Sequence, residues 1–188
     1  MAPTAIILHG TTSAGKSSIA TALQATAPVP AFHISLDAFV TMSNRRDMRS
    51  DSERGQAYGI HCENLRSTLA RVAQTHFDIV LDLVLRDQAE MDACLQALRG
   101  RPTYIVRVWA PLDVLEQRER TRDDRAPRMA REQIDHPAYR RPYDLEVDSS
   151  LCTPEEGAAA VRRLIREQPR LTGQSLETNL NLLSNIDG

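Results

Sequence analysis

The 188-residue sequence has little of several features that would narrow its function at once. Its three cysteines, Cys62, Cys94 and Cys152, are too few and too widely spaced for a disulfide framework or a structural zinc site. Its net charge is only −2, with charged residues at 26%, so the chain as a whole does not attract nucleic acid. We therefore expect no nucleic-acid partner, and any affinity for phosphate groups must come from a local site.

Long hydrophobic runs are also missing. The apolar run near the N-terminus is too short for a signal peptide or a transmembrane helix, so we expect a cytoplasmic protein with no membrane partner. Hydrophobic residues still make up 41% of the chain, which at this length is enough for one domain with a buried core.

Short apolar runs alternate with amphipathic segments along most of the chain. We predict strands at residues 5–8, 31–36, 77–83, 103–109 and 143–147, and helices at residues 16–24, 63–75, 88–98, 111–120 and 154–168. Residues 41–60 are polar and rich in arginine, so we expect a loop or a mobile helical segment there. This alternation predicts an α/β fold with a parallel sheet. We place the domain at residues 1–168; residues 169–188 form a tail that docks as a helix, contacts a partner or frays.

The segment IILHGTTSAGKSS, at residues 6–18, contains the P-loop pattern G-x-x-x-x-G-K-[ST] between a predicted strand and a predicted helix. Small residues let the backbone curl so that its N–H groups point at phosphate oxygens, and the helix start adds a partial positive charge. Lys16 would reach the outer phosphates, and the Ser17 hydroxyl would bind Mg²⁺. We therefore predict that ATP and Mg²⁺ bind here, with the nucleotide held by Gly10, Thr11, Thr12, Ser13, Ala14, Gly15, Lys16, Ser17 and Ser18.

Two carboxylates lie at or just after the C-terminal ends of predicted strands. Asp82 lies near the C-terminal end of its strand, where open parallel sheets bind ligands, and we predict that it holds the metal; Asp78, at the other end, is an ordinary strand-start residue. Asp37 ends the preceding strand and is expected at the same edge of the sheet. It could accept the proton of an acceptor hydroxyl, or it could cap a helix that begins at Ala38. The spacing alone leaves both interpretations open.

Residues 118–131 are dense in arginine and form a candidate lid. Guanidinium groups bind phosphate in a bidentate manner, but such charge runs are usually solvated helix faces, and Glu119, Asp123 and Asp124 could neutralise part of this one. We still expect at least one arginine to contact the nucleotide, because a small kinase needs a cation and a cover that excludes water.

Four stretches together resemble the chloramphenicol phosphotransferase-like family of small P-loop kinases: IILHGTTSAGKSS, SLDAF, IVLDLVL, and RTRDDRAPRMAREQ followed by YDLEVDSS. The resemblance runs from Ile6 to about Leu164. It implies a nucleoside-kinase-like three-layer sandwich with a five-stranded parallel sheet and a short arginine-rich lid. It also implies that Asp37 is the catalytic base, that Lys16 serves catalysis as well as binding, and that Arg125 is the catalytic lid arginine, with Arg122 as a second contact to the nucleotide.

The chain departs from this family at two places. Pro127 and Arg128 precede Met129-Ala130 where the family commonly has Gly-Met-Ala, and His136 is displaced from the position expected just before the Tyr-Asp pair. In addition, residues 44–49 are more basic than an uncharged antibiotic would require. We therefore do not take chloramphenicol as the acceptor.

These patterns favour an ATP- and Mg²⁺-dependent phosphotransferase that phosphorylates a hydroxyl group of a small molecule, either antibiotic-like or a related metabolite. One alternative is a nucleotide or metabolite kinase whose arginines at residues 44–49 grip an acceptor phosphate. Another is a nucleotide-binding switch without acceptor turnover, against which stand Asp37 and the missing guanine-specifying N-K-x-D pattern. The sequence is compatible with a homo-oligomer.

Overall fold

The computed structural model describes residues 3–44, 48–84, 88–121 and 128–170. Its centre is a five-stranded sheet in the order β2-β3-β1-β4-β5. The strands are β1 (Ala5–His9), β2 (Ala31–Ser35), β3 (Asp78–Leu83), β4 (Thr103–Trp109) and β5 (Leu145–Asp148). All neighbouring strands are parallel, which confirms the predicted α/β fold with a five-stranded parallel sheet.

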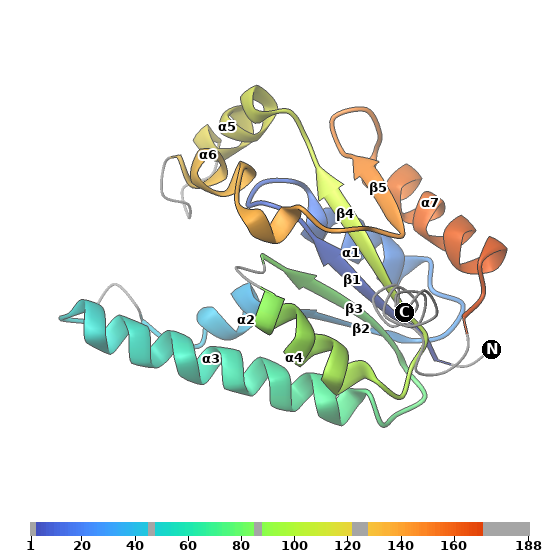
Figure 1. The fold of residues 1–188 in the computed structure, drawn as a ribbon, viewed down its shortest axis with the longest axis horizontal. Helices are drawn as coiled ribbons and strands as arrows, with labels where there is room; N and C mark the ends of the chain where they lie inside the picture. Colours follow the sequence, from blue (N-terminus) through green and yellow to red (C-terminus); the bar gives the residue numbers. More distant parts are fainter. Residues whose placement is uncertain (1–2, 45–47, 85–87, 122–127, 171–188) are drawn as a thin grey trace, which may run out of the picture.

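Helices cover both faces of the sheet, which gives three layers (Figure 1). Helices α1 (Lys16–Ala25) and α7 (Pro154–Glu167) lie on one face, and α3 (Asp51–Val72) and α4 (Gln88–Leu98) lie on the other. Side chains of β1 alternate between the two core clusters: Ile6 and Leu8 join the cluster of α1 and α7, whereas Ala5 and Ile7 join that of α3 and α4. A strand buried on both faces therefore reads as a continuous apolar run, as the sequence showed.

Short helices gather at the carboxyl ends of the strands. Helix α2 (Leu36–Val40) follows β2, and α5 (Leu112–Arg120) follows β4. Helix α6 (Met129–Ile134) and a 3₁₀ turn (Pro137–Tyr139) come next in the chain. Open parallel sheets bind their ligands at this edge.

Of the two expectations for residues 41–60, a loop or a helical segment, helix α3 favours the helical one from Asp51 onward. It begins at Asp51, twelve residues before the predicted start, with Ser50 Oγ accepting a hydrogen bond from the Glu53 N–H at 3.1 Å as an N-cap. Its first half is largely exposed, and its buried residues begin only at His61. Because that half has no apolar stripe, the hydrophobic pattern gave no signal for it.

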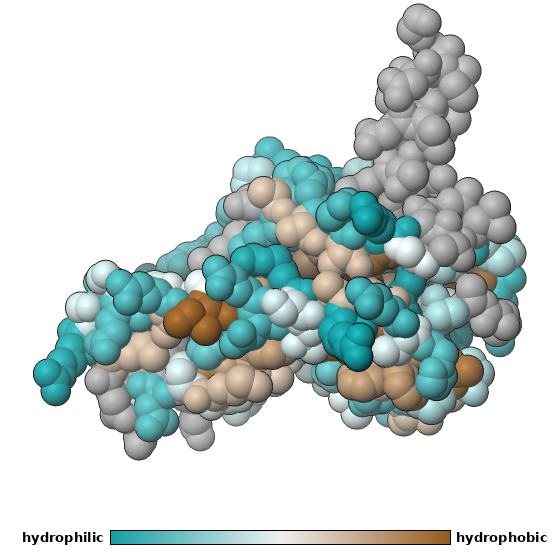
Figure 2. Space-filling view, turned by 90° about the horizontal axis from the view of Figure 1, so that it is seen from below, coloured by the Kyte–Doolittle hydropathy of each residue, from teal (hydrophilic) through white to brown (hydrophobic). Residues whose placement is uncertain are grey.

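Figure 2 shows that the described residues on the side of α3 are mainly hydrophilic, with separate hydrophobic patches among them. Within the described residues, no helix combines the length and the apolar character needed to cross a membrane.

Arg101, just before β4, fixes the connection between α3 and β3. Its side chain is 2% exposed, and its guanidinium donates to the backbone carbonyls of Val72 (2.8 Å), Ala73 (2.8 Å), Thr75 (2.5 Å) and Phe77. Carbonyl groups at a helix C-terminus lack intrahelical partners and attract cations. One buried cation therefore supplies hydrogen-bond donors to four carbonyl groups of this turn.

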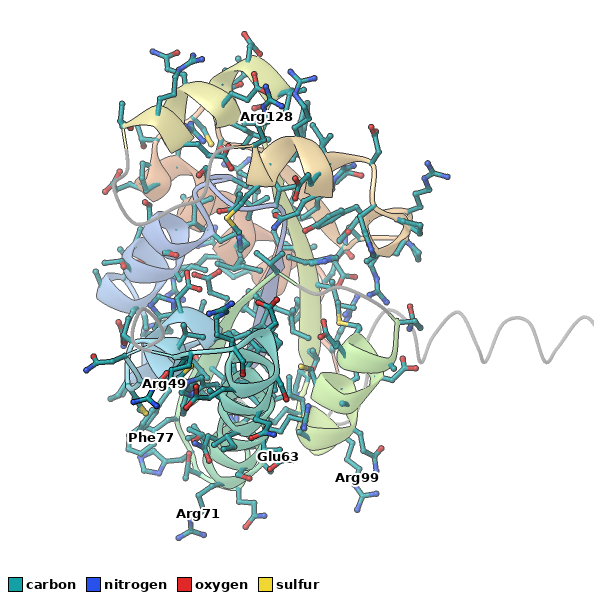
Figure 3. All side chains as sticks on the ribbon, turned by 90° about the vertical axis from the view of Figure 1, so that its left-hand side faces the viewer. Arg49, Glu63, Arg71, Phe77, Arg99 and Arg128 are labelled. Atoms are coloured by element: carbon teal, nitrogen blue, oxygen red, sulfur yellow. The ribbon has the colours of Figure 1, made fainter. Side chains whose placement is uncertain are left out.

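We expect Arg101→Met to lower the free energy of unfolding by about 3 kcal/mol, because it leaves several buried carbonyls without a donor. Arg99→Met is the matched control, since Arg99 is exposed and points away from the body (Figure 3), and it should change stability by about 0.5 kcal/mol at most. Chemical denaturation of both variants checks this; equal effects would contradict the role of Arg101.

Candidate active site

The P-loop, residues 10–17, connects β1 to α1 at the centre of the sheet. Gly10 lies so close to β4 that a Cβ atom there would be 2.0 Å from the Val108 carbonyl oxygen. Ser13 and Gly15 have left-handed backbone angles, with φ of 59° and 89°. Left-handed residues alternating with ordinary ones turn successive N–H groups to one side and form a concave anion site.

Several donors around this loop are available to a phosphate group. Helix α1 begins at Lys16 with no side chain capping its first N–H groups and no acidic residue in its first turn. The buried hydroxyls of Thr12 and Ser13 have no hydrogen-bond partner among the described residues. Because buried polar atoms are normally paired, these positions fit an oxyanion ligand.

Lys16 and Ser17 both approach the carboxylate of Asp82 on β3. Lys16 Nζ donates to the Thr11 carbonyl at 2.8 Å and lies 3.9 Å from Asp82 Oδ1, while Ser17 Oγ donates to Asp82 Oδ2 at 2.6 Å. His33 Nε2 on β2 lies 3.6 Å from the same Oδ2, too far for a hydrogen bond but close enough for an electrostatic contact. Asp82 is therefore at the edge where the sequence predicted it, but the sequence gave no reason to expect His33 beside it.

The environment of Asp82 keeps it ionised. Burial alone would raise its pKa, but the contacts with His33, Lys16 and Ser17 outweigh burial and hold the pKa below its usual value. An ionised carboxylate and a hydroxyl are oxygen ligands that Mg²⁺ takes together with substrate phosphates. Ser17 and Asp82 thus fit a magnesium site.

A pocket of about 520 Å³ opens beside the P-loop. Residues of α2, α3 and the end of β3 also line it: Leu36, Asp37, Val40, Tyr58 and Val84. The remaining lining residues that lie outside the P-loop and α1 include residues of α5, α6 and the segment after β5: Arg118, Thr121, Met129, Gln133, Ser149, Cys152, Thr153 and Pro154. In Figure 3, Arg128 at the start of α6 lies near the top of the view, and Arg49 just before α3 lies in its lower half.

Asp37 lies in the first turn of α2 and lines this pocket. The helix-cap interpretation of Asp37 is wrong, because the N-cap is Ser35, whose Oγ accepts a hydrogen bond from the Ala38 N–H at 3.3 Å. Helix α2 therefore begins at Leu36 rather than at Ala38. The role of Asp37 as a base stays a prediction.

Among the described residues of the predicted lid, Arg118 is the arginine that contacts the P-loop. Its guanidinium donates to the Ser13 carbonyl at 3.3 Å, to Ser149 Oγ at 2.9 Å and to the Ser149 carbonyl at 2.8 Å. Its neighbour Glu119 is buried, and its Oε1 accepts a hydrogen bond from the Ala130 N–H at 2.7 Å, at the start of α6. Arg122 and Arg125 lie outside the described residues, as do Asp123 and Asp124, so their roles stay predictions.

The fold and this loop define the chain as a P-loop kinase. It belongs to the chloramphenicol phosphotransferase-like family, whose sequence model matches residues 3–166. No curated protein sequence matches the chain significantly.

Solved structures of kinases share the fold at low sequence identity. A putative kinase from Chloroflexus aurantiacus is 20% identical, covering 87% of this chain and 98% of its own, with a TM-score of 0.66. An APS kinase from Mycobacterium tuberculosis, solved with AMPPNP and APS, is 16% identical over 88% and 98% of the two chains, with a TM-score of 0.63. A tunicamycin resistance protein from Deinococcus radiodurans is 14% identical over 92% and 99%, with a TM-score of 0.61. Family and fold together indicate a small nucleotide-binding kinase that phosphorylates a small molecule.

We expect Gly10→Ala to disrupt the P-loop, because its Cβ would overlap the Val108 carbonyl and force the loop away from β4. The variant should lose about 2 kcal/mol of stability and bind ATP at least about tenfold more weakly. Thermal unfolding and ATP titration measure both effects.

Gly59→Ala in α3 is the matched control, because a Cβ there meets nothing within 4 Å. Alanine in a helix should raise stability by up to about 1 kcal/mol without weakening ATP binding. If Gly10→Ala behaved like this control, the close contact with β4 would not hold the loop.

Proposed function

We propose that the protein is an ATP- and Mg²⁺-dependent kinase that phosphorylates a hydroxyl group on an uncharged small molecule. The observation that carries this proposal is that one pocket is lined both by the P-loop and by Asp37. A phosphoryl donor and an acceptor held in that pocket would meet between these two groups, as in-line transfer requires.

In the proposed reaction, the ATP phosphates lie along residues 10–18, with Lys16 next to the outer ones. Asp37 accepts the proton of the acceptor hydroxyl while that oxygen forms a bond to the terminal phosphorus. The bond between this phosphorus and the bridging oxygen breaks, and ADP leaves. Ser17 and Asp82 would hold Mg²⁺, which neutralises charge on the phosphates when bound. Arg125 and Arg122 would contact the nucleotide, as the family resemblance predicts.

The acceptor side of the pocket favours a molecule with an apolar body. Besides the polar residues Ser35 and Asp37, the lining there includes Leu36, Val40, Tyr58 and Val84, which offer apolar surface and one aromatic ring. Pockets lined in this way fix a ligand by shape and by a few polar groups. A hydroxyl-bearing, mainly apolar acceptor matches this surface.

The charges around the pocket argue against the alternative of an acceptor phosphate gripped by arginines. Among the described lining residues, the cations are Lys16 and Arg118, and both contact the P-loop rather than the acceptor side. Arg54, in the first turns of α3, is paired with Asp51 at 2.5 Å and does not line the pocket. Arg45 and Arg46 lie outside the described residues. An uncharged acceptor is therefore the better match.

We expect ADP release from Mg·ATP to be stimulated by at least one member of a panel of hydroxylated antibiotics, nucleosides and nucleotides, with the phosphoryl group recovered on that compound. Asp37→Asn should lower this turnover about 100-fold or more while ATP binding stays within about twofold, because the variant loses the base and not the P-loop. Asp113→Asn, at an exposed position on α5, is the control and should match the wild type.

Full turnover by Asp37→Asn would refute the assignment of the base. A nucleotide acceptor preferred over every uncharged compound would instead support the nucleotide-kinase alternative. ATP binding that changes the affinity of the chain for a protein partner, without phosphorylation of any acceptor, would support the switch.

A further inference from the structure

Gln133, on α6, reaches into the P-loop from far along the chain. Its Oε1 accepts a hydrogen bond from the Thr12 N–H at 2.8 Å, although the two residues are 121 positions apart. The carbonyl of the same peptide group belongs to Thr11 and accepts from Lys16 Nζ at 2.8 Å. This peptide is therefore held on one side by Lys16 and on the other by Gln133.

The orientation of the Gln133 amide follows from its partner. A backbone N–H can only donate, so the amide oxygen must face Thr12 and the NH₂ group must face elsewhere. Gln133 lines the pocket together with Lys16, and its Nε2 has no hydrogen-bond partner among the described residues. The site thus contains a neutral amide donor whose orientation is fixed in advance.

Helix α6 is anchored at its start, which holds Gln133 in place. Glu119 accepts from the Ala130 N–H, and Ala130 itself is fully buried. Arg131 pairs with Glu116 of α5 at 2.7 Å. Helix α6 is consequently fixed to α5, and its Met129 and Gln133, one turn apart, both line the pocket.

The position along the loop indicates which part of a nucleotide Gln133 would meet. Residues at the end of a P-loop and the start of its helix surround the inner phosphates, whereas the P-loop lysine reaches the outer ones. Lys16 Nζ and Gln133 hold the two sides of one peptide at the beginning of the loop. With a nucleotide in the loop, that peptide would therefore lie at the outer-phosphate end of the site.

We propose that Gln133 Nε2 donates a hydrogen bond to the terminal phosphoryl group of the bound nucleoside triphosphate, with Thr12 fixing the amide for this purpose. This assignment rests on the proposed function, because it requires a triphosphate in the loop. It predicts discrimination between triphosphate and diphosphate, since ADP lacks the group that Gln133 would contact. Its test therefore needs no acceptor.

The experiment measures dissociation constants of Mg·ATP and Mg·ADP, without acceptor, for the wild type and three variants. Gln133→Met keeps the side-chain length but removes both the amide donor and acceptor. Gln133→Glu keeps an oxygen for the Thr12 N–H but removes the donor and adds a charge. Glu132→Gln is the control at the adjacent exposed position on α6. Thermal unfolding of each variant confirms that the fold is intact.

We expect Gln133→Met to weaken ATP binding about tenfold and ADP binding less than about twofold, since a hydrogen bond to a charged group is lost only with ATP. Gln133→Glu should weaken ATP binding further, because its carboxylate repels the phosphate, and Glu132→Gln should match the wild type.

Three results would overturn the assignment. Unchanged ATP binding by Gln133→Met would show that the amide donor does not contact ATP, and an effect confined to Gln133→Glu would show charge repulsion alone. Equal losses for ATP and ADP in Gln133→Met, with neither lost in Gln133→Glu, would show that Gln133 only supports the loop. Failure of the wild type itself to bind ATP would refute the proposed function, and this outcome is visible without any variant.

Discussion

The contact between Ser17 and Asp82 is the interaction on which the candidate site depends. It joins the first turn of α1 to the carboxyl end of β3 at 2.6 Å, and it places a buried carboxylate within 3.9 Å of the Lys16 ammonium. A buried carboxylate is costly unless charges and donors surround it, and Asp82 has both. The same contacts that make this burial tolerable also arrange a hydroxyl, a carboxylate and a cation around the space beside the loop.

A second constraint acts from α5, through two adjacent residues with different tasks. Arg118 holds the P-loop and the segment after β5, and Glu119 holds the start of α6. Because neighbouring residues on a helix point in different directions, one turn of α5 can support two walls of the pocket at once. A substitution in this turn would therefore disturb both the P-loop and α6. The effects of single substitutions here on the free energy of unfolding should be non-additive.

The parts of this structure that follow local rules could be predicted from the sequence. Continuous apolar runs gave the buried strands, and a single motif gave the P-loop with its strand and helix. The first half of α3 could not be predicted, because an exposed helix with glycines at residues 55 and 59 has neither an apolar stripe nor high propensity.

The residues of the site also divide into those that the sequence could predict and those that it could not. Asp82 and Asp37 could be placed at one sheet edge because Asp82 lies near the end of one parallel strand and Asp37 closely follows the end of another. Arg118 and Gln133 could not be singled out, since they meet the loop across 105 and 121 residues of sequence. Their identification requires the tertiary structure, because no spacing in the sequence distinguishes them from solvated neighbours.

The most direct test of the account is to map where an acyl-phosphate derivative of ATP modifies the protein. Such a reagent acylates an amine next to the terminal phosphate, and Lys16 is the only lysine among the 188 residues. The account predicts acylation of Lys16, detected by peptide mass spectrometry, and its suppression by excess Mg·ATP. Modification confined to the terminal amine, or labelling of Lys16 that ATP does not suppress, would contradict the placement of the triphosphate in this loop.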